Sequence, residues 1–222
     1  MTTTLYVFTG TGNSLAAAEF LAQKLGDTVI ESIPIRMKKA GVVIPDTNKV
    51  GFVFPVNYCG VPFILSEFIP RVSLSHVPYI FAVATAGGIG RYALLQLDKM
   101  LKKNGSSLQA GWLVRMVDNY IPYGGAPDEK TQKNLLSDAE SLLANIANSI
   151  QAEKTEMPGF PVLSQLLHFL LYPRFIRSLS EIDTRFHVDD TCNGCGICNQ
   201  VCPADNIRII DNKPVWQHHC LF

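Results

Sequence analysis

Five short apolar runs alternate with helical patterns through the first two thirds of the chain, and this order constrains the fold more than any other feature. The runs are rich in strand-forming residues and span 4–8, 28–35, 49–54, 79–84 and 111–117. Apolar residues at helical spacing predict helices over 13–25, 63–69, 91–103 and 128–152. Strands that alternate with helices form a doubly wound parallel sheet, with right-handed crossovers and helices on both faces. We therefore predict an α/β domain with a five-stranded parallel sheet.

Glycines and hydroxyl residues fill the turn after the first run. Its sequence is Thr9-Gly10-Thr11-Gly12-Asn13-Ser14. Backbone N–H groups in a tight turn, together with the positive end of a helix dipole, form an anion site. Glycine lets the backbone approach the anion closely, while the hydroxyls and the Asn13 amide add hydrogen-bonding groups. A phosphomonoester ligand such as flavin mononucleotide (FMN) fits this turn best.

Two other phosphate-binding motifs fit the turn less well, and a purely structural turn stays open. A P-loop requires a lysine in G-x4-G-K-[ST], and the turn has none. The dinucleotide fingerprint G-x-G-x-x-G requires a third glycine where this chain has Leu15. Glu31 does lie at the distance expected for a ribose-binding acid, so the dinucleotide alternative also stays open.

Four cysteines near the end of the chain have the spacing C-x2-C-x2-C-x3-C-P. They are Cys192, Cys195, Cys198 and Cys202, and Pro203 follows them. This is the spacing with which bacterial ferredoxins bind [4Fe–4S] clusters. A tetrahedral zinc site is the alternative, but the spacing suits it poorly.

The turn and the cysteine run together resemble the fused flavodoxin–ferredoxin proteins. Residues 8–14 are similar to the FMN phosphate loop of flavodoxins, and the alternating strands and helices match a flavodoxin-like domain. The resemblance implies a flavodoxin-like FMN-binding domain at 1–153 and a linker with an apolar helix at 154–183. It also implies a small C-terminal ferredoxin-like iron–sulfur module at 184–222.

The resemblance further implies that two more loops contact the flavin. The residues concerned are Pro55, Val56, Asn57, Tyr58 and Gly60 in one loop, and Thr85, Ala86, Gly87 and Gly88 in the other. Tyr58 is the candidate for stacking on the ring, and an ordinary turn with a surface tyrosine is the alternative. Residues 116–123 are expected to shape access to the site, with no single residue assigned. We expect Cys59 to be a packed small residue rather than a nucleophile.

In two-cluster ferredoxins the fourth cysteine of a run ligates the other cluster. The resemblance therefore implies that the ligand set of this chain is incomplete. Cys192, Cys195 and Cys198 would hold one cluster, Cys202 would contribute to a second, and Cys220 would be the first ligand of that second cluster. We expect a truncated chain. A single cluster completed by Cys202 or Cys220, or a chain that has lost its clusters, are the alternatives.

Composition narrows the function classes. The 222 residues are 47% hydrophobic and 17% charged with a formal net charge of zero, so the chain has no electrostatic case for binding nucleic acid. Clustered cysteines without an export signal point to a reducing, cytoplasmic location. Residues 162–175 form an apolar stretch that is shorter than the roughly 20 residues of a membrane span. We expect Pro173 to interrupt a helix in this stretch. We expect a buried or docking helix there, with an in-plane membrane or partner-binding helix as the alternative.

These patterns predict an electron-transfer flavoprotein that passes electrons between a [4Fe–4S] cluster and FMN, with a redox protein as donor or acceptor. One alternative is an FMN-dependent reductase of a small organic acceptor fed by the cluster. Another is a non-redox module that binds a different phosphate ligand. The oligomeric state is not indicated.

Overall fold

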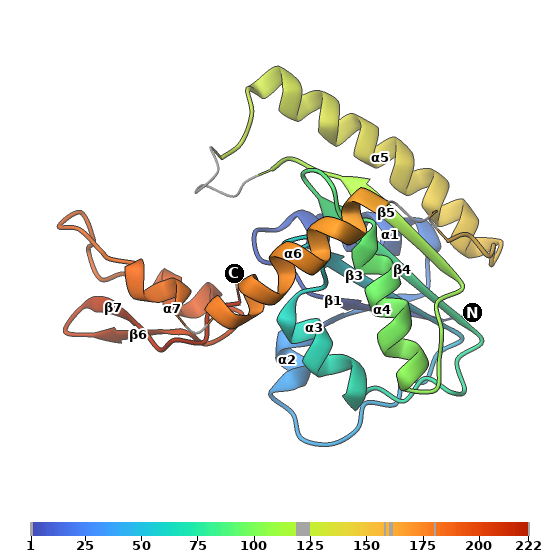
Figure 1. The fold of residues 1–222 in the computed structure, drawn as a ribbon, viewed down its shortest axis with the longest axis horizontal. Coiled ribbons are helices and arrows are strands. Elements are labelled where there is room, and N and C mark those ends of the chain that lie inside the picture. The colour runs from blue at the N-terminus through green and yellow to red at the C-terminus, as the bar shows by residue number, and fades with distance from the viewer. Residues whose placement is uncertain (1, 119–124, 158, 160–161, 180, 222) are drawn as a thin grey trace.

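A computed structural model describes residues 2–118, 125–157, 159, 162–179 and 181–221. A five-stranded sheet forms its centre, and every neighbouring pair of strands is parallel (Figure 1). The strand order is β2-β1-β3-β4-β5. Their bounds are β1 Thr3–Val7, β2 Thr28–Ser32, β3 Lys49–Pro55, β4 Tyr79–Ala86 and β5 Ala110–Arg115. This is the strand order of the flavodoxin-like doubly wound fold, as the alternating pattern predicts.

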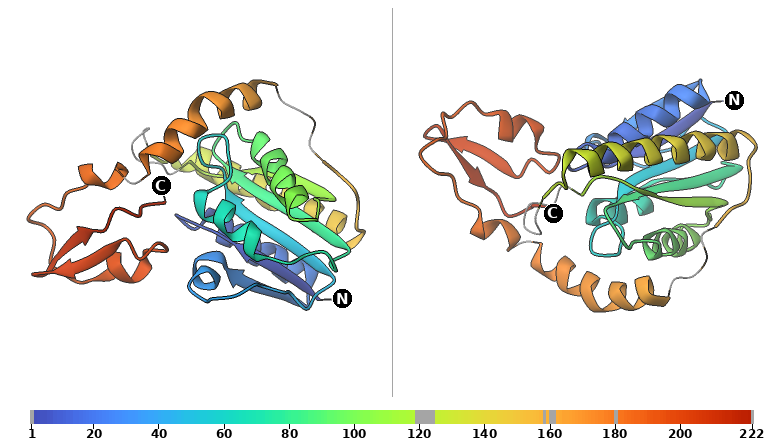
Figure 2. Two further views of the ribbon diagram at one scale, coloured as in Figure 1. Left: turned by 60° about the horizontal axis from the view of Figure 1, so that its bottom comes forward. Right: turned by 90° about the horizontal axis from the view of Figure 1, so that it is seen from above.

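Helices cover both faces of the sheet. Figure 2 shows α1 (Asn13–Leu25) and α5 (Glu129–Gln151) on one face, and α3 (Phe63–Phe68) and α4 (Tyr92–Lys103) on the other. Alternate side chains of β1 serve the two cores, because successive strand residues point to opposite faces. Tyr6 packs in the core beneath α3 and α4, whereas Leu5 and Val7 pack beneath α1 and α5.

Several element boundaries differ from the sequence-based expectation. The second run ends as a strand at Ser32, because Pro34 lies at the start of a short helix, α2 (Ile33–Met37). The helix expected at 63–69 is α3 followed by a 3-10 turn, Ile69–Arg71. The long helix begins at Glu129, where the Asp128 carboxylate accepts a hydrogen bond of 3.0 Å from Thr131 N.

The apolar helix α6 (Val162–Ser178) continues through Pro173, so the expected break at this proline is wrong. The proline removes one backbone donor, but tertiary packing on both sides of it keeps the helix intact. Figure 2 shows α6 outermost, beyond α4, on the α3–α4 face of the sheet. No helix in the described part of the chain is both long and apolar enough to cross a bilayer.

The C-terminal segment extends away from the sheet (Figure 1). It contains a 3-10 turn (Ile182–Arg185), a short helix α7 (Ile197–Val201) and an antiparallel pair of strands, β6 (Ile207–Ile210) and β7 (Lys213–Trp216). The Lys38 ammonium lies 2.6 Å from the Asp205 carboxylate and joins this segment to α2. A two-stranded sheet and a short helix do not by themselves show the ferredoxin-like module expected at 184–222.

Candidate functional site

A cavity of about 320 Å³ lies at the carboxyl ends of β1, β3 and β4. This is the switch point of the strand order, where open α/β sheets bind ligands. The volume falls at the lower end of the range for small-molecule sites, roughly 300–1,000 Å³. The lining residues are Thr9, Gly10, Thr11, Asn13, Ser14, Pro55, Val56, Asn57, Tyr58, Cys59, Thr85, Ala86, Gly87, Gly88, Ile89, Val117, Asp118 and Phe175.

The three loops singled out in the sequence meet at this cavity. We call residues 9–14 the first loop, 55–62 the second loop and 85–90 the third loop. Thirteen of their fifteen candidate residues line the cavity, and Gly12 and Gly60 do not. The convergence follows from the topology, because parallel strands present their carboxyl ends at one edge of the sheet.

The first loop forms a turn at the N-terminus of α1. Gly12 has a φ of +103° and caps the helix, a conformation that favours glycine. Gly12 N donates to Thr9 Oγ1 at 3.0 Å, which closes the turn. The first-turn N–H groups of α1 therefore begin beside the Thr9, Thr11 and Ser14 side chains at the cavity wall.

Two side chains of the first loop also fasten it to its neighbours. The buried Ser14 hydroxyl lies 2.8 Å from the Thr85 hydroxyl of the third loop. Asn13 Nδ2 donates to Val117 O at 2.9 Å and so holds the segment that leaves β5. The expectation that Asn13 adds a ligand-binding amide therefore holds at most for its second N–H and its carbonyl oxygen.

The second loop turns sharply at Tyr58 and Cys59. Asn57 and Gly60 exchange backbone hydrogen bonds of 3.0 and 2.8 Å, while Tyr58 and Cys59 have φ values of +46° and +63°. Positive φ at both central residues is the pattern of a type I′ turn, in which glycine and asparagine are preferred. Tyr58 and Cys59 are therefore in a strained conformation that the surroundings must hold.

Helix α6 supplies those surroundings. Tyr172 OH donates to Val61 O at 2.9 Å, and His168 Nδ1 lies 3.2 Å from Cys59 O. Gln96 Oε1 on α4 accepts from Val61 N at 2.9 Å. Burial raises the pKa of the Tyr172 hydroxyl, so it stays a donor at neutral pH, and burial lowers the pKa of His168. We refer to these contacts of His168 and Tyr172 with the second loop as the α6 clamp.

Phe175 is the lining residue that the sequence patterns missed. Its ring stacks on Tyr58 with centroids 4.3 Å apart and an interplanar angle of 20°. It comes from α6, far along the chain from the loops, and no local signal marks it. It adds a second aromatic side chain to the lining beside Tyr58.

Other parts of the lining were left unassigned or expected to be inert. Burial raises the pKa of the Cys59 thiol, whose sulfur lies 3.7 Å from Ile89 O, and both features fit the expected packing role. Val117 and Asp118 belong to the segment for which no single residue was assigned. Residues 119–123 of that segment lie outside the described residues.

The cysteine run does not form a comparable site. Among the residues that the structure describes, no three His, Cys, Asp or Glu side chains are grouped to hold a metal ion. Cys192, Cys195, Cys198 and Cys202 form no disulfide, and Cys202 Sγ accepts from Asn206 N at 3.3 Å. As placed, these thiols are not gathered around one point.

Comparisons with known proteins add little to this geometry. No protein-family model and no curated protein matches the sequence. An azoreductase from Bacillus anthracis str. Sterne is 12% identical, with 67% of this chain and 100% of that chain covered and a TM-score of 0.46. The two-electron reduced flavodoxin of Megasphaera elsdenii is 14% identical, with 63% and 98% covered and a TM-score of 0.42. An NAD(P)H:quinone oxidoreductase from Methanothermobacter marburgensis is 13% identical, with 65% and 94% covered and a TM-score of 0.43. At these values the likenesses carry no argument about function, which must come from the cavity itself.

Proposed function

We propose that the cavity binds FMN and that the protein transfers electrons through it. The observation that carries the proposal is a single cavity that joins a phosphate-type turn to an aromatic wall. The turn is the N-terminus of α1 with its hydroxyl side chains, and the wall is the Tyr58–Phe175 stack. A phosphate at one end of the ligand and a planar ring system at the other match these two halves.

The charges of the lining favour backbone recognition of the phosphate. The described lining contains no Lys, Arg or His, and Asp118 is its one carboxylate. Donors for an anion therefore come from backbone N–H groups, hydroxyls and the dipole of α1. This distinguishes the site from a P-loop, in which a lysine reaches the phosphates.

The dinucleotide alternative loses its acidic residue in the structure. Two nitrogens of the Arg36 guanidinium group contact this carboxylate: Nη2 donates to Glu31 Oε1 at 2.8 Å, and Nε donates to Oε2. Glu31 is also not among the residues that line the cavity. A carboxylate engaged in this way does not fit the role of a ribose-binding acid.

FMN, when bound, exchanges one or two electrons. The role of this protein would be to hold the flavin and to shield it from water. The first loop would fix the phosphate end, while the second and third loops and Phe175 would exclude water from the ring. The α6 clamp would keep the strained turn at Tyr58 and Cys59 in one conformation beside the ring.

Cysteine spacing is the sole support for an iron–sulfur cluster as the redox partner of the flavin. We propose a [4Fe–4S] cluster on Cys192, Cys195, Cys198 and Cys202 or Cys220, in a reducing compartment, the cytoplasm. Because the described thiols are not gathered, no step of the mechanism is routed through the cluster. Iron and sulfide content after anaerobic reconstitution tests it, and a chain that takes up neither ion removes the cluster from the proposal.

The experiment that tests the FMN site compares FMN with riboflavin, which lacks the phosphate. Titration by flavin fluorescence should give tighter binding of FMN. Thr11→Ala combined with Ser14→Ala should weaken FMN by about two orders of magnitude, from two lost hydrogen bonds to a charged group, and should leave riboflavin nearly unchanged. Ser66→Ala, a hydroxyl removal on α3 away from the cavity, is the matched control.

Ser14→Ala also leaves the buried Thr85 hydroxyl without this partner, so unfolding must be measured alongside. Equal affinity for FMN and riboflavin in the wild-type protein would show that the turn does not read a phosphate. Failure to bind either flavin would reject the proposal. Turnover of quinones by the FMN-bound protein would favour a reductase over an electron carrier.

A further inference from the structure

Helix α6 carries its most apolar face outward. Val162, Leu163, Leu166, Phe169 and Leu170 are 48–78% exposed, and we call them the α6 stripe. Their spacing places them on one side of the helix. Buried Ser164, His168 and Phe175 make up the opposite side.

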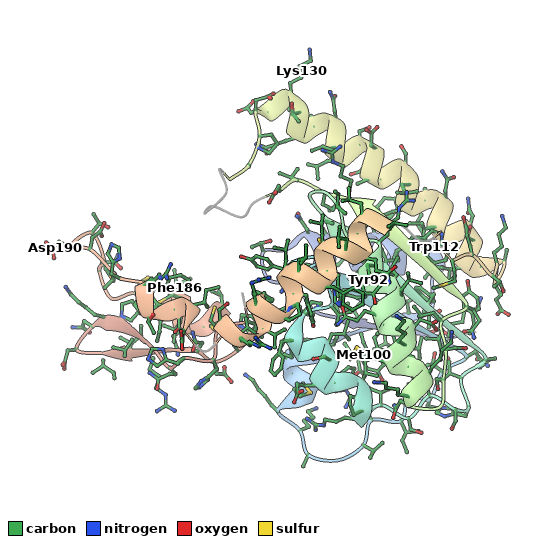
Figure 3. All side chains as sticks on the ribbon, in the orientation of Figure 1. Tyr92, Met100, Trp112, Lys130, Phe186 and Asp190 are labelled. Atoms are coloured by element: carbon green, nitrogen blue, oxygen red, sulfur yellow. The ribbon has the colours of Figure 1, made fainter. Side chains whose placement is uncertain are left out.

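Contacts of the inner face hold the stripe in this orientation. Tyr92 N on α4 lies 3.0 Å from Ser164 Oγ, and the Tyr92 ring lies 4.4 Å from the ring of His168. Figure 3 labels Tyr92, which lies where α4 passes beneath α6. A helix that buries a serine and a histidine while exposing leucines has an outer face suited to an apolar environment.

Positively charged side chains flank the stripe. The sequence has no Asp or Glu between Glu156 and Glu181, and the exposed Arg174 and Arg177 lie at the end of α6. Lys99 Nζ lies 3.2 Å from Tyr92 OH, and the Tyr92 ring contacts the Phe169 ring at a centroid distance of 5.8 Å. An anionic surface would complement this arrangement.

The same charges disfavour a second copy of the chain. Arg91 is exposed and adjoins Tyr92 near the start of α6, whereas Arg174 and Arg177 lie near its end. Two stripes packed antiparallel would therefore bring like charges together at both ends. The stripe is also a protruding helix ridge, which a fluid bilayer accommodates without a matching groove.

We propose that the α6 stripe docks the protein on an anionic membrane surface, with α6 lying in the plane of the interface. The aliphatic and aromatic side chains would enter the acyl boundary, and the flanking cations would contact lipid phosphates. This inference is independent of the FMN site, because the stripe faces away from Phe175 and the cavity.

Sedimentation of the whole chain with vesicles tests the proposal. We expect binding to vesicles of equal parts phosphatidylcholine and phosphatidylglycerol to be at least about tenfold tighter than to phosphatidylcholine alone. Leu166→Ser with Phe169→Ser should weaken binding about tenfold or more, because less apolar surface is buried. Arg174→Gln with Arg177→Gln should weaken binding to the anionic vesicles by about thirtyfold at low salt and reduce its salt dependence.

The controls separate this surface from others. Val42→Ser with Ile44→Ser removes two exposed apolar side chains outside α6 and should not change vesicle binding. If the Leu166 and Phe169 double variant melts lower than wild type, Leu163→Ser alone replaces it, since Leu163 is also exposed. Equal binding by wild type and stripe variants, or no binding to anionic vesicles, would overturn the proposal. So would a lipid-free dimer that the stripe substitutions convert to monomer, because a second copy would then cover the stripe.

Discussion

Replacing Gly60 with alanine tests whether α6 holds the second loop. Gly60 does not have a positive φ, so alanine suits its backbone and only space is at issue. A methyl group there would overlap the Tyr172 ring and stand 2.9 Å from Gln96 Oε1. Either α6 must lift from the loop or the turn at Tyr58 and Cys59 must move.

The structure sets the size of the effect. Overpacking of this kind costs roughly 1–3 kcal/mol. Displacement of Tyr172 or Gln96 also weakens their hydrogen bonds to Val61, each worth about 1 kcal/mol. We therefore expect Gly60→Ala to lower the free energy of unfolding by about 3 kcal/mol. For a chain of this length the melting temperature should fall by roughly 6–12 °C in circular dichroism.

A double-mutant cycle isolates the clamp. Tyr172→Ala removes the ring that the methyl group would overlap, so adding Gly60→Ala to it should cost only about 1 kcal/mol more, from the remaining contact with Gln96 Oε1. Gly88→Ala is the matched control, because a methyl group at Gly88 meets nothing within 4 Å and its φ is not positive. A Gly60→Ala protein as stable as wild type, or additive effects of the two changes, would refute the packing of α6 on this loop.

Two further predictions concern buried groups. Burial lowers the pKa of His168 below its value of about 6.5 in the unfolded chain. As the pH falls, the unfolded chain therefore takes up this proton first. The contribution of His168 to the free energy of unfolding should be complete above pH ~6.5 and should decrease below it, by at most about 1.4 kcal/mol per pH unit. Urea unfolding at pH 7.5 and 5.5 should show a smaller pH dependence for His168→Gln than for wild type or His187→Gln, and an unchanged dependence would contradict the burial. Lys49→Met should cost about 2 kcal/mol, because the buried Lys49 ammonium lies 3.0 Å from Ile150 O at the end of α5 and 3.1 Å from the Glu153 carboxylate. Lys24→Met, at an exposed lysine, is the control, and chemical denaturation measures both variants. Equal losses in the free energy of unfolding would mean that Lys49 does not support α5.

Hydrophobic periodicity was enough to predict the sheet and the meeting of the three loops. Parallel order follows from the alternation of strands and helices, and parallel order places Thr9, Asn57 and Thr85 at one edge. Local chemistry then marks the first and third loops, because glycines let the backbone approach a ligand closely and hydroxyl side chains can hydrogen-bond to it. The binding of FMN and of a cluster stays a prediction.

Tertiary packing decided the features that the sequence did not reveal. Phe175 reaches the cavity only because α6 lies across α4, and nothing near Phe175 in the chain signals that path. The effect of Pro173 was overestimated, since contacts of His168 before it and Phe175 after it hold the helix. Pro34 was read as part of a strand, although proline also suits the first turn of a helix.

The α6 clamp bears on where the chain can be divided. The predicted boundary at 153 assigns α6 to a linker, yet this helix supplies one wall of the cavity and holds the turn opposite it. Limited proteolysis before Val162 would therefore release no free helix, because the cut piece would stay seated on α4 and the second loop. A gene fragment that ends at residue 153 would encode the complete sheet but a cavity without Phe175 and a tyrosine turn without its support.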